Sequence, residues 1–234
     1  MTAHGPNVST AGQAARQPVD LRPLVSSILM DQGARPVCVP FALSLAHEAV
    51  TASNSDPAMA PEAIWWRASS RAQVSAGGML LEDAGDALTA TGQPPLNDWP
   101  WNPLLGAGTE PPPPAAGTPP WRTATMEELA LAHDGVEDEL EDALAAGSPI
   151  VLVVEVTTEF ENATAEGLIE IPDIRSPAGD YHAVLVVGAT TDPDHGRLLL
   201  IRNSWSKYWG AGGYGWLPTD YLIAHAVQAA IVVI

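Results

Sequence analysis

The sequence predicts an α+β protein with two segregated halves, helices first and strands second. Apolar residues recur at helical spacing in three segments of the first half, 38–52, 57–72 and 80–92. Strongly β-branched or alternating runs follow in the second half, at 149–156, 182–189, 197–205, 213–218 and 226–234. Because helices and strands are not interleaved, we expect a helical lobe beside a strand-rich lobe.

The chain is expected to form one domain of two lobes, preceded by a tail. Residues 1–17 lack periodicity and are predicted to be flexible, 18–120 to form the mainly helical lobe, and 121–234 the β-rich lobe. The proline-rich stretch 109–120 is expected to be a rigid surface insertion, although a docking ligand in the polyproline conformation is an alternative. Two short helices are predicted within the second lobe, at 126–132 and 136–147.

Composition excludes several classes of function. The 234 residues carry a formal charge of −18, which opposes binding to nucleic acid or to an anionic membrane surface. No run of about 18 apolar residues is present, and the N-terminus lacks the basic-then-apolar pattern of a secretory signal. A single cysteine allows no internal disulfide. We therefore expect a cytoplasmic protein without cofactor or metal, since no residues show metal-ligand spacing.

Cys38, the only cysteine, has two interpretations. A free cysteine usually behaves as a small buried apolar residue. Here Gly33 and Pro36 form a turn just before it, and Phe41 and Leu45 begin a helical pattern just after it. Unpaired N–H groups and the helix dipole at a helix start favour an anion. We therefore expect a lowered thiol pKa and a nucleophilic sulfur.

His182 is the best candidate among six histidines for the base that such a nucleophile needs. It opens the strand 182–189, whose edge can face a helix start. His47 lies nine residues after Cys38 on the same helix, which places the two side chains on roughly opposite faces. Asn203 ends the next strand, where its amide could hold the imidazole ring.

Four segments together resemble the papain-like (C1-type) cysteine peptidase family. DQGARPVCVPFA is similar to the family's nucleophile segment, and YHAVLVVGA to its histidine strand. NSWSKYWGAGGYGWL resembles its Asn-Ser-Trp segment, and SAGGMLLEDAGDAL its Gly-Gly segment. The 144 residues from Cys38 to His182 fall within the known signature's spacing of about 130–150. The resemblance runs from about Val19 to the C-terminus.

This resemblance implies a papain-like two-lobed fold, with a helical lobe, an antiparallel β-barrel-like lobe and an active-site cleft between them. It implies cleavage of a peptide or protein substrate through a thioester on Cys38, from a resting thiolate–imidazolium pair with His182. Gln32 would donate to the oxyanion, and Asn203 would orient the histidine. The implied catalytic residues are Gln32, Cys38, His182 and Asn203. The implied substrate-binding residues are Gly77, Gly78, Met79, Ala183 and Trp205, with a simple turn as the alternative for the glycine pair.

Departures from the family bear on specificity. Arg35 stands where a disulfide cysteine is usual, which is consistent with a reducing compartment. Val37 and Val39 flank the nucleophile with β-branched bulk and Pro36 stiffens the approach, so we expect a narrow cleft. No recognisable inhibitory propeptide precedes the first strand, which also favours narrow specificity. Alternatives are an acyltransferase or peptide ligase with the same site, or a non-catalytic peptide-binding homologue.

Overall fold

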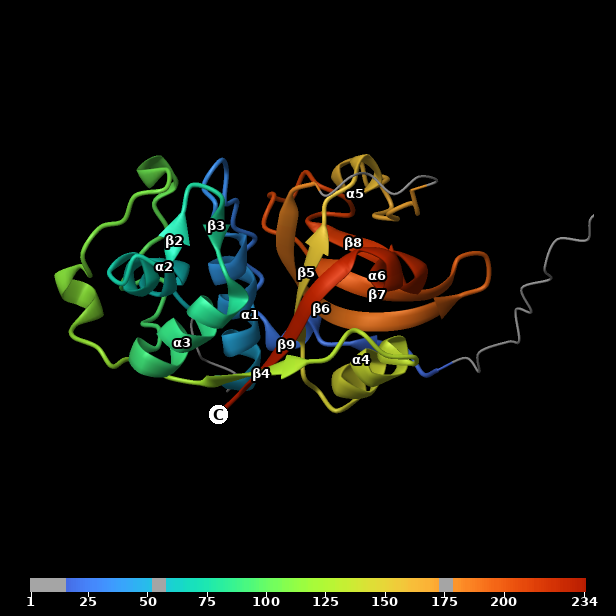
Figure 1. The fold of residues 1–234 in the computed structure, drawn as a ribbon, viewed down its shortest axis with the longest axis horizontal. Coiled ribbons are helices and arrows are strands. Elements are labelled where there is room, and N and C mark those ends of the chain that lie inside the picture. The colour runs from blue at the N-terminus through green and yellow to red at the C-terminus, as the bar shows by residue number, and fades with distance from the viewer. Residues whose placement is uncertain (1–15, 52–57, 173–178) are drawn as a thin grey trace, which may run out of the picture.

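Helices α2 (Pro61–Ser69) and α3 (Leu81–Thr91) lie on one side of the molecule and the large sheet on the other, with α1 (Cys38–Thr51) between them (Figure 1). The computed structural model describes residues 16–51, 58–172 and 179–234. The expected α+β class with two lobes is confirmed. The predicted tail, 1–17, lies outside the described residues except for its last two positions.

The helical lobe contains α1, α2 (Pro61–Ser69) and α3 (Leu81–Thr91). Proline is tolerated in the first turn of a helix, and Pro61 opens α2 there. Gly92 ends α3 with φ of 68°, and a Cβ at this position would lie 2.0 Å from the Arg122 carbonyl oxygen. The rest of this lobe is a two-stranded hairpin and three short 3₁₀ turns: β2 (Val74–Ser75), β3 (Gly78–Met79), η1 (Arg22–Leu24), η2 (Pro103–Leu105) and η3 (Pro114–Ala116).

The second lobe is built on one antiparallel sheet in the order β4-β9-β5-β6-β7-β8, with β1 added to β6. Its strands are β1 (Val19–Asp20), β4 (Thr125–Leu129), β5 (Ile150–Glu155), β6 (Tyr181–Asp192), β7 (Gly196–Arg202), β8 (Tyr214–Pro218) and β9 (Ala226–Val233). The helices of this lobe are α4 (Val136–Ala145), α5 (Thr158–Glu161) and α6 (Thr219–His225).

Both faces of the central strands are buried, which explains their continuous apolar runs. Successive strand residues point to opposite faces. Val151 and Val153 of β5 therefore face the core shared with α1, whereas Ile150, Leu152 and Val154 face the core covered by α4 and α6. The helix that carries Cys38 is thus packed on the sheet that carries His182.

Two boundaries differ from the prediction. The segment 126–132 was expected to be helical, but Thr125–Leu129 forms β4, which pairs with β9. Pairing with the last strand outweighs the local helix propensity of its Met, Glu and Leu residues. The strand Val19–Asp20 was assigned with 18–120 to the helical lobe, but it pairs with β6 in the sheet. Neither partner is adjacent in sequence, so local pattern cannot detect these pairings.

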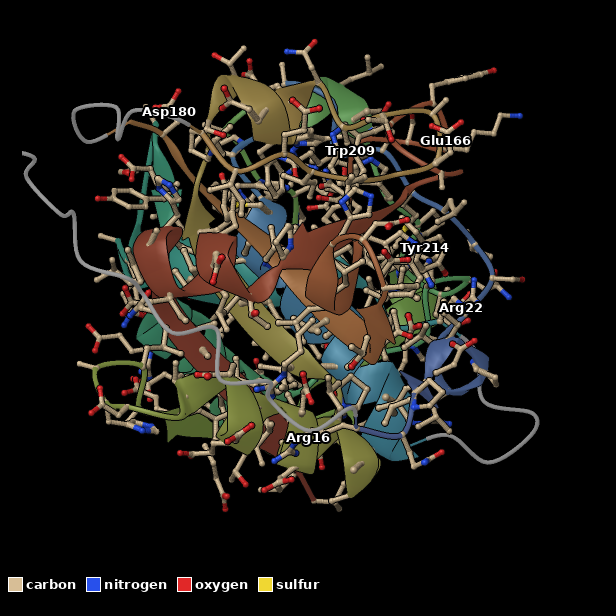
Figure 2. All side chains as sticks on the ribbon, turned by 90° about the vertical axis from the view of Figure 1, so that its right-hand side faces the viewer. Arg16, Arg22, Glu166, Asp180, Trp209 and Tyr214 are labelled. Carbon is tan, nitrogen blue, oxygen red and sulfur yellow. The ribbon has the colours of Figure 1, made fainter. Side chains whose placement is uncertain are left out.

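The N-terminal end of the described chain is fixed to the β lobe far from the cleft. Arg16 forms ion pairs with Asp138, Glu141 and Asp142 of α4. Figure 2 shows Arg16 at one edge of the molecule and Asp180, which lines the cleft, near the opposite edge. Within the described ranges, no helix is both long and apolar enough to cross a membrane.

Candidate active site

Cys38 is the first residue of α1 and lies at the junction of two hollows. The thiol is half-buried and forms no disulfide. Both hollows, of about 680 and 440 Å³, are lined by Cys38 and by His182. The fold therefore places the two predicted partners, 144 residues apart in sequence, in one cleft between the lobes.

Asn203 determines which nitrogen of His182 carries a proton. The Asn203 Oδ1 atom accepts a hydrogen bond from the Ser204 backbone N–H at 2.7 Å, which identifies this atom as the carbonyl end of the amide. The same Oδ1 lies 2.7 Å from His182 Nε2. Because a carbonyl oxygen can only accept, Nε2 must donate, and in the neutral ring Nδ1 is then the acceptor. His182 is thereby held in the tautomer that a general base requires.

Aromatic rings cover this hydrogen bond. The Trp205 ring stacks on His182, with centroids 4.5 Å apart and an interplanar angle of 30°. Phe160 lies edge-on to both rings. His182 and Asn203 are only 4% and 3% exposed. Trp205 was predicted to bind substrate. The structure places it over the bond and on the wall of the smaller hollow.

Burial affects the expected charge states of Cys38 and His182. It lowers the pKa of His182 to about 4, against a smaller opposite effect of the Asn203 hydrogen bond. Burial also raises the pKa of the Cys38 thiol. Backbone N–H groups of Ala183, Val39 and Cys38 act in the opposite direction, as the helix-start argument predicts, but their effect is smaller. The expected lowered thiol pKa is therefore corrected. Both shifts also oppose the expected resting ion pair, because each favours the neutral form of its group.

Gln32 sits where the two lobes meet. Its backbone N–H donates to the Ser204 carbonyl, and its Oε1 accepts from Ser204 Oγ at 2.6 Å. Its Nε2 donates to the Arg35 carbonyl at 3.0 Å. Gln32 lines the smaller hollow together with Cys38. A side-chain amide nitrogen has two hydrogens, so one remains for a ligand in that hollow.

The larger hollow brings together four of the predicted substrate-binding residues: Gly77, Gly78, Met79 and Ala183. Turn and binding interpretations of the glycine pair are both compatible with the structure. Gly77 lies in the two-residue turn between β2 and β3, and Gly78 begins β3 with φ of 122°. The hairpin therefore presents glycine backbone to the cleft.

The structure corrects one argument for a narrow cleft. Val37 is fully buried against Phe41 and Trp65, so it cannot narrow the space around the thiol. Val39 lines the larger hollow and Pro36 the smaller one, as expected.

Two features of the site were not predicted. Ser204 holds Gln32, and Arg35 lies in a buried ion pair with Glu62. The contact of Ser204 with Gln32 could have been suspected from the sequence, because Ser204 is next to Asn203. The Arg35–Glu62 ion pair has no such sequence signal, because the two residues are 27 positions apart. In the part of the chain that the structure describes, no three His, Cys, Asp or Glu side chains form a possible metal site.

Solved structures with this fold include cysteine proteases. Xylellain, a cysteine protease from Xylella fastidiosa, matches 94% of this chain and 86% of its own, with a TM-score of 0.73 and 23% identity. Digestive procathepsin L 3 of Tenebrio molitor matches 98% of this chain and 73% of its own, with a TM-score of 0.74 and 20% identity. At these identities the likeness establishes the fold.

Sequence comparison adds a family match for the second half of the chain. The family model described as papain family cysteine protease matches residues 117–231, which include His182 and Asn203. A cathepsin L-like protein of Caenorhabditis elegans is 33% identical over 81 residues, 35% of this chain and 24% of that protein. Cathepsin Q of Rattus norvegicus is 38% identical over 87 residues, 36% of this chain and 25% of that protein. Residues 117–231 thus match the papain family, and the chain has the fold of cysteine proteases of known structure.

The papain-family match and the geometry cover different parts of the site. The matched segments span about a quarter of the length of these curated relatives. The family model begins after Cys38 and Gln32, so the places of these two residues depend on the fold and on their contacts. The catalytic roles of Gln32, Cys38, His182 and Asn203 stay predictions.

Proposed function

We propose that this protein is a papain-family cysteine peptidase that cleaves peptide bonds through a thioester on Cys38. One observation carries the proposal: Asn203 leaves Nδ1 of His182 as an acceptor, in the same cleft as the thiol at the start of α1. A nucleophile beside an oriented base is the arrangement that acyl transfer requires.

In the first half-reaction His182 Nδ1 takes the thiol proton as Cys38 sulfur attacks the substrate carbonyl. The free N–H of Gln32 Nε2 and the Cys38 backbone N–H stabilise the oxyanion. When the carbonyl reforms, the C–N bond breaks and the imidazolium donates its proton to the departing amine. The acyl group is then held as a thioester.

In the second half-reaction His182 Nδ1 takes a proton from water, and the resulting hydroxide attacks the thioester carbonyl. The C–S bond breaks, the acid leaves, and the imidazolium returns its proton to the sulfur. The pair ends neutral, as it began, which agrees with a buried site that disfavours separated charges.

We further propose narrow specificity. It is supported by Val39 and Pro36 on the walls of the two hollows and by the acidic surface, whose charge of −18 repels acidic segments. Neutral and basic peptides with apolar residues are the expected substrates.

Mass spectrometry of a mixed peptide library and of denatured casein tests this proposal, with Cys38→Ala as the control. We expect cleavage of few peptides, little loss of casein and none with Cys38→Ala. Rapid degradation of casein would refute narrow specificity. Products joined to an added amine would instead indicate acyl transfer, and peptide binding without any product would indicate a non-catalytic homologue.

We propose that the protein acts in a reducing compartment such as the cytoplasm. The support is its single cysteine and the buried Arg35–Glu62 pair in the region where the family usually has a disulfide. Fractionation of cells that contain the protein tests this location, and recovery with secreted material would refute it.

A further inference from the structure

We propose that Arg35 is a positioning residue that holds the Gln32 amide in its oxyanion-binding orientation. This inference rests on the peptidase function proposed above. Arg35 does not touch the cleft with its charged group. It acts through its own backbone, which is fixed by an ion pair buried beneath the loop that leads to Cys38.

The Arg35 guanidinium is fully enclosed and every one of its five N–H donors is used. It is 1% exposed and its partner Glu62, on α2, is fully buried. The two terminal guanidinium nitrogens, Nη1 and Nη2, donate hydrogen bonds to the two carboxylate oxygens of Glu62. The remaining donors bind backbone carbonyls of Asn102, Gly106 and Gly108, at 2.7, 2.8 and 3.2 Å. Arg35 thereby joins its own loop to α2 and to the segment 102–108.

The Arg35 backbone is bonded to Gln32 in both directions. The Arg35 carbonyl accepts from Gln32 Nε2 at 3.0 Å, and the Arg35 N–H donates to the Gln32 carbonyl at 3.2 Å. From the other lobe, Ser204 holds Gln32 Oε1. Two of the four hydrogen-bonding positions of the Gln32 side-chain amide are therefore occupied, one on each of its two polar atoms. The second N–H of Nε2 is left for the hollow that contains Cys38.

Trp101 provides a second connection between the ion pair and this loop. Its ring lies 4.2 Å from the Arg35 guanidinium carbon, in a cation–π contact. Its Nε1 donates to the carbonyl of Asp31, the residue before Gln32, at 3.0 Å. The ring also packs edge-on against Phe41 of α1, with centroids 4.7 Å apart. Arg35 and Trp101 therefore hold both sides of Gln32.

Lysine cannot replace Arg35 in this role. Its ammonium has three donors on one atom, whereas the site uses five donors in a planar fork. Glu62→Gln and Arg35→Lys should therefore both release the loop, and Trp101→Leu should do so without leaving a buried charge unpaired. A matched control is Asp20→Asn, which breaks the exposed bidentate pair of Asp20 with Arg22.

Steady-state kinetics test the connection to Gln32. Removal of an oxyanion donor lowers kcat by about 10²–10³, so Gln32→Ala should show a loss of this size. We expect Glu62→Gln and Trp101→Leu to lower kcat by about tenfold with little change in KM, and Asp20→Asn to change neither. In the Gln32→Ala background, Glu62→Gln should cause no further loss. An equal tenfold loss in both backgrounds would overturn the proposal, because a merely structural role does not depend on Gln32.

Nuclear magnetic resonance tests the positioning without any turnover. The Gln32 side-chain amide signal, assigned by its disappearance in Gln32→Glu, should shift in Glu62→Gln and in Trp101→Leu but not in Asp20→Asn. An unmoved signal in folded Glu62→Gln and Trp101→Leu would overturn the proposal. If wild type cleaves no peptide, the proposed function fails, yet the signal still decides whether Arg35 positions Gln32.

Discussion

Three consecutive residues after β7 organise the candidate site. Asn203 selects the tautomer of His182, Ser204 holds Gln32, and Trp205 covers the histidine ring. These side chains therefore hold the proposed base, the proposed oxyanion donor and the ring that covers the histidine. Small movements of this tripeptide should affect activity more than stability.

We predict that Asn203→Ala lowers kcat by about 10²-fold with little change in KM, because His182 loses the partner that orients it. The free energy of unfolding should fall by about 1–3 kcal/mol, because the buried His182 Nε2 and the Ser204 N–H lose their acceptor. Two hydrogen bonds are lost with Asn203 Oδ1, while the buried Nδ2, which has no partner, is removed as well. Asn162→Ala, at the exposed end of α5, is the control. Unchanged turnover in Asn203→Ala would contradict the assigned role.

The lowered pKa of His182 predicts acid sensitivity. Its pKa is about 4 in the folded chain, against an ordinary value of 6.5, so between these values the unfolded chain binds a proton that the folded chain does not. The stabilising contribution of neutral His182 is therefore complete above about pH 6.5 and is lost as pH falls to about 4, by about 3 kcal/mol in full.

Urea unfolding of wild type and of His182→Gln at about pH 7.5 and pH 4.5 measures this contribution. Both proteins contain the other buried titratable groups, so the effects of those groups cancel in the comparison. We expect wild type to lose about 2–3 kcal/mol more than the variant. The acid limb of kcat/KM should also lie near pH 4, since the base must be neutral. Equal losses in the two proteins would show that His182 is not buried in its neutral form.

At the scale of elements, β6 connects the two halves of the molecule. It pairs with β5, β7 and β1, it carries His182 at its start, and α1 packs on it. Its register shifts between Val186 and Gly188, where the Val187 carbonyl accepts from the Leu21 N–H at 2.7 Å. The N-terminal strand β1 pairs with β6 directly beside this irregularity.

We predict that Gly188→Ala detaches or displaces β1. A Cβ at this position would lie 2.5 Å from the Val19 carbonyl oxygen, which is backbone and cannot rotate away. The variant should lose about 1–3 kcal/mol of unfolding free energy, measured with urea. Gly77→Ala is the control, since its Cβ would meet only a Ser75 side-chain oxygen at 3.7 Å. If both substitutions cost the same, the close approach of β1 is not what stabilises this region.

At the scale of the whole molecule, the protein carries a large excess of negative charge. Its 28 acidic residues exceed its 10 basic ones, and several of the basic side chains are already engaged by carboxylates, among them Arg16, Arg35 and Arg197. The surface field is therefore negative, and it acts on a charged substrate before contact.

We predict that salt changes the preference among peptides. When sodium chloride rises from about 20 mM to about 500 mM, kcat/KM should fall severalfold for a basic peptide and rise for an acidic one, because screening shortens the range of the field. A neutral peptide of the same length is the control. Parallel changes for all three peptides would exclude electrostatic selection.

Much of the fold and of the candidate site could be predicted from short stretches of the sequence. Periodicities of 3.6 and 2 placed α1, α2, α3 and the strands from β5 onward, because each segment buries one face or both. Turn residues placed Cys38 at a helix start, and the spacing of the family's motifs identified Gln32, His182 and Asn203 as candidates. These signals lie within short stretches of chain, so they can be read without a fold.

Tertiary structure decided the rest, because it depends on partners distant in the chain. Thr125–Leu129 is a strand because it pairs with β9, and Val19–Asp20 joins the β lobe because it pairs with β6. The sign of the Cys38 pKa shift depends on burial between the lobes, which outweighs the helix start. Arg35 has a function only where Glu62 and the segment 102–108 enclose it, since a guanidinium needs partners on every side once water is removed.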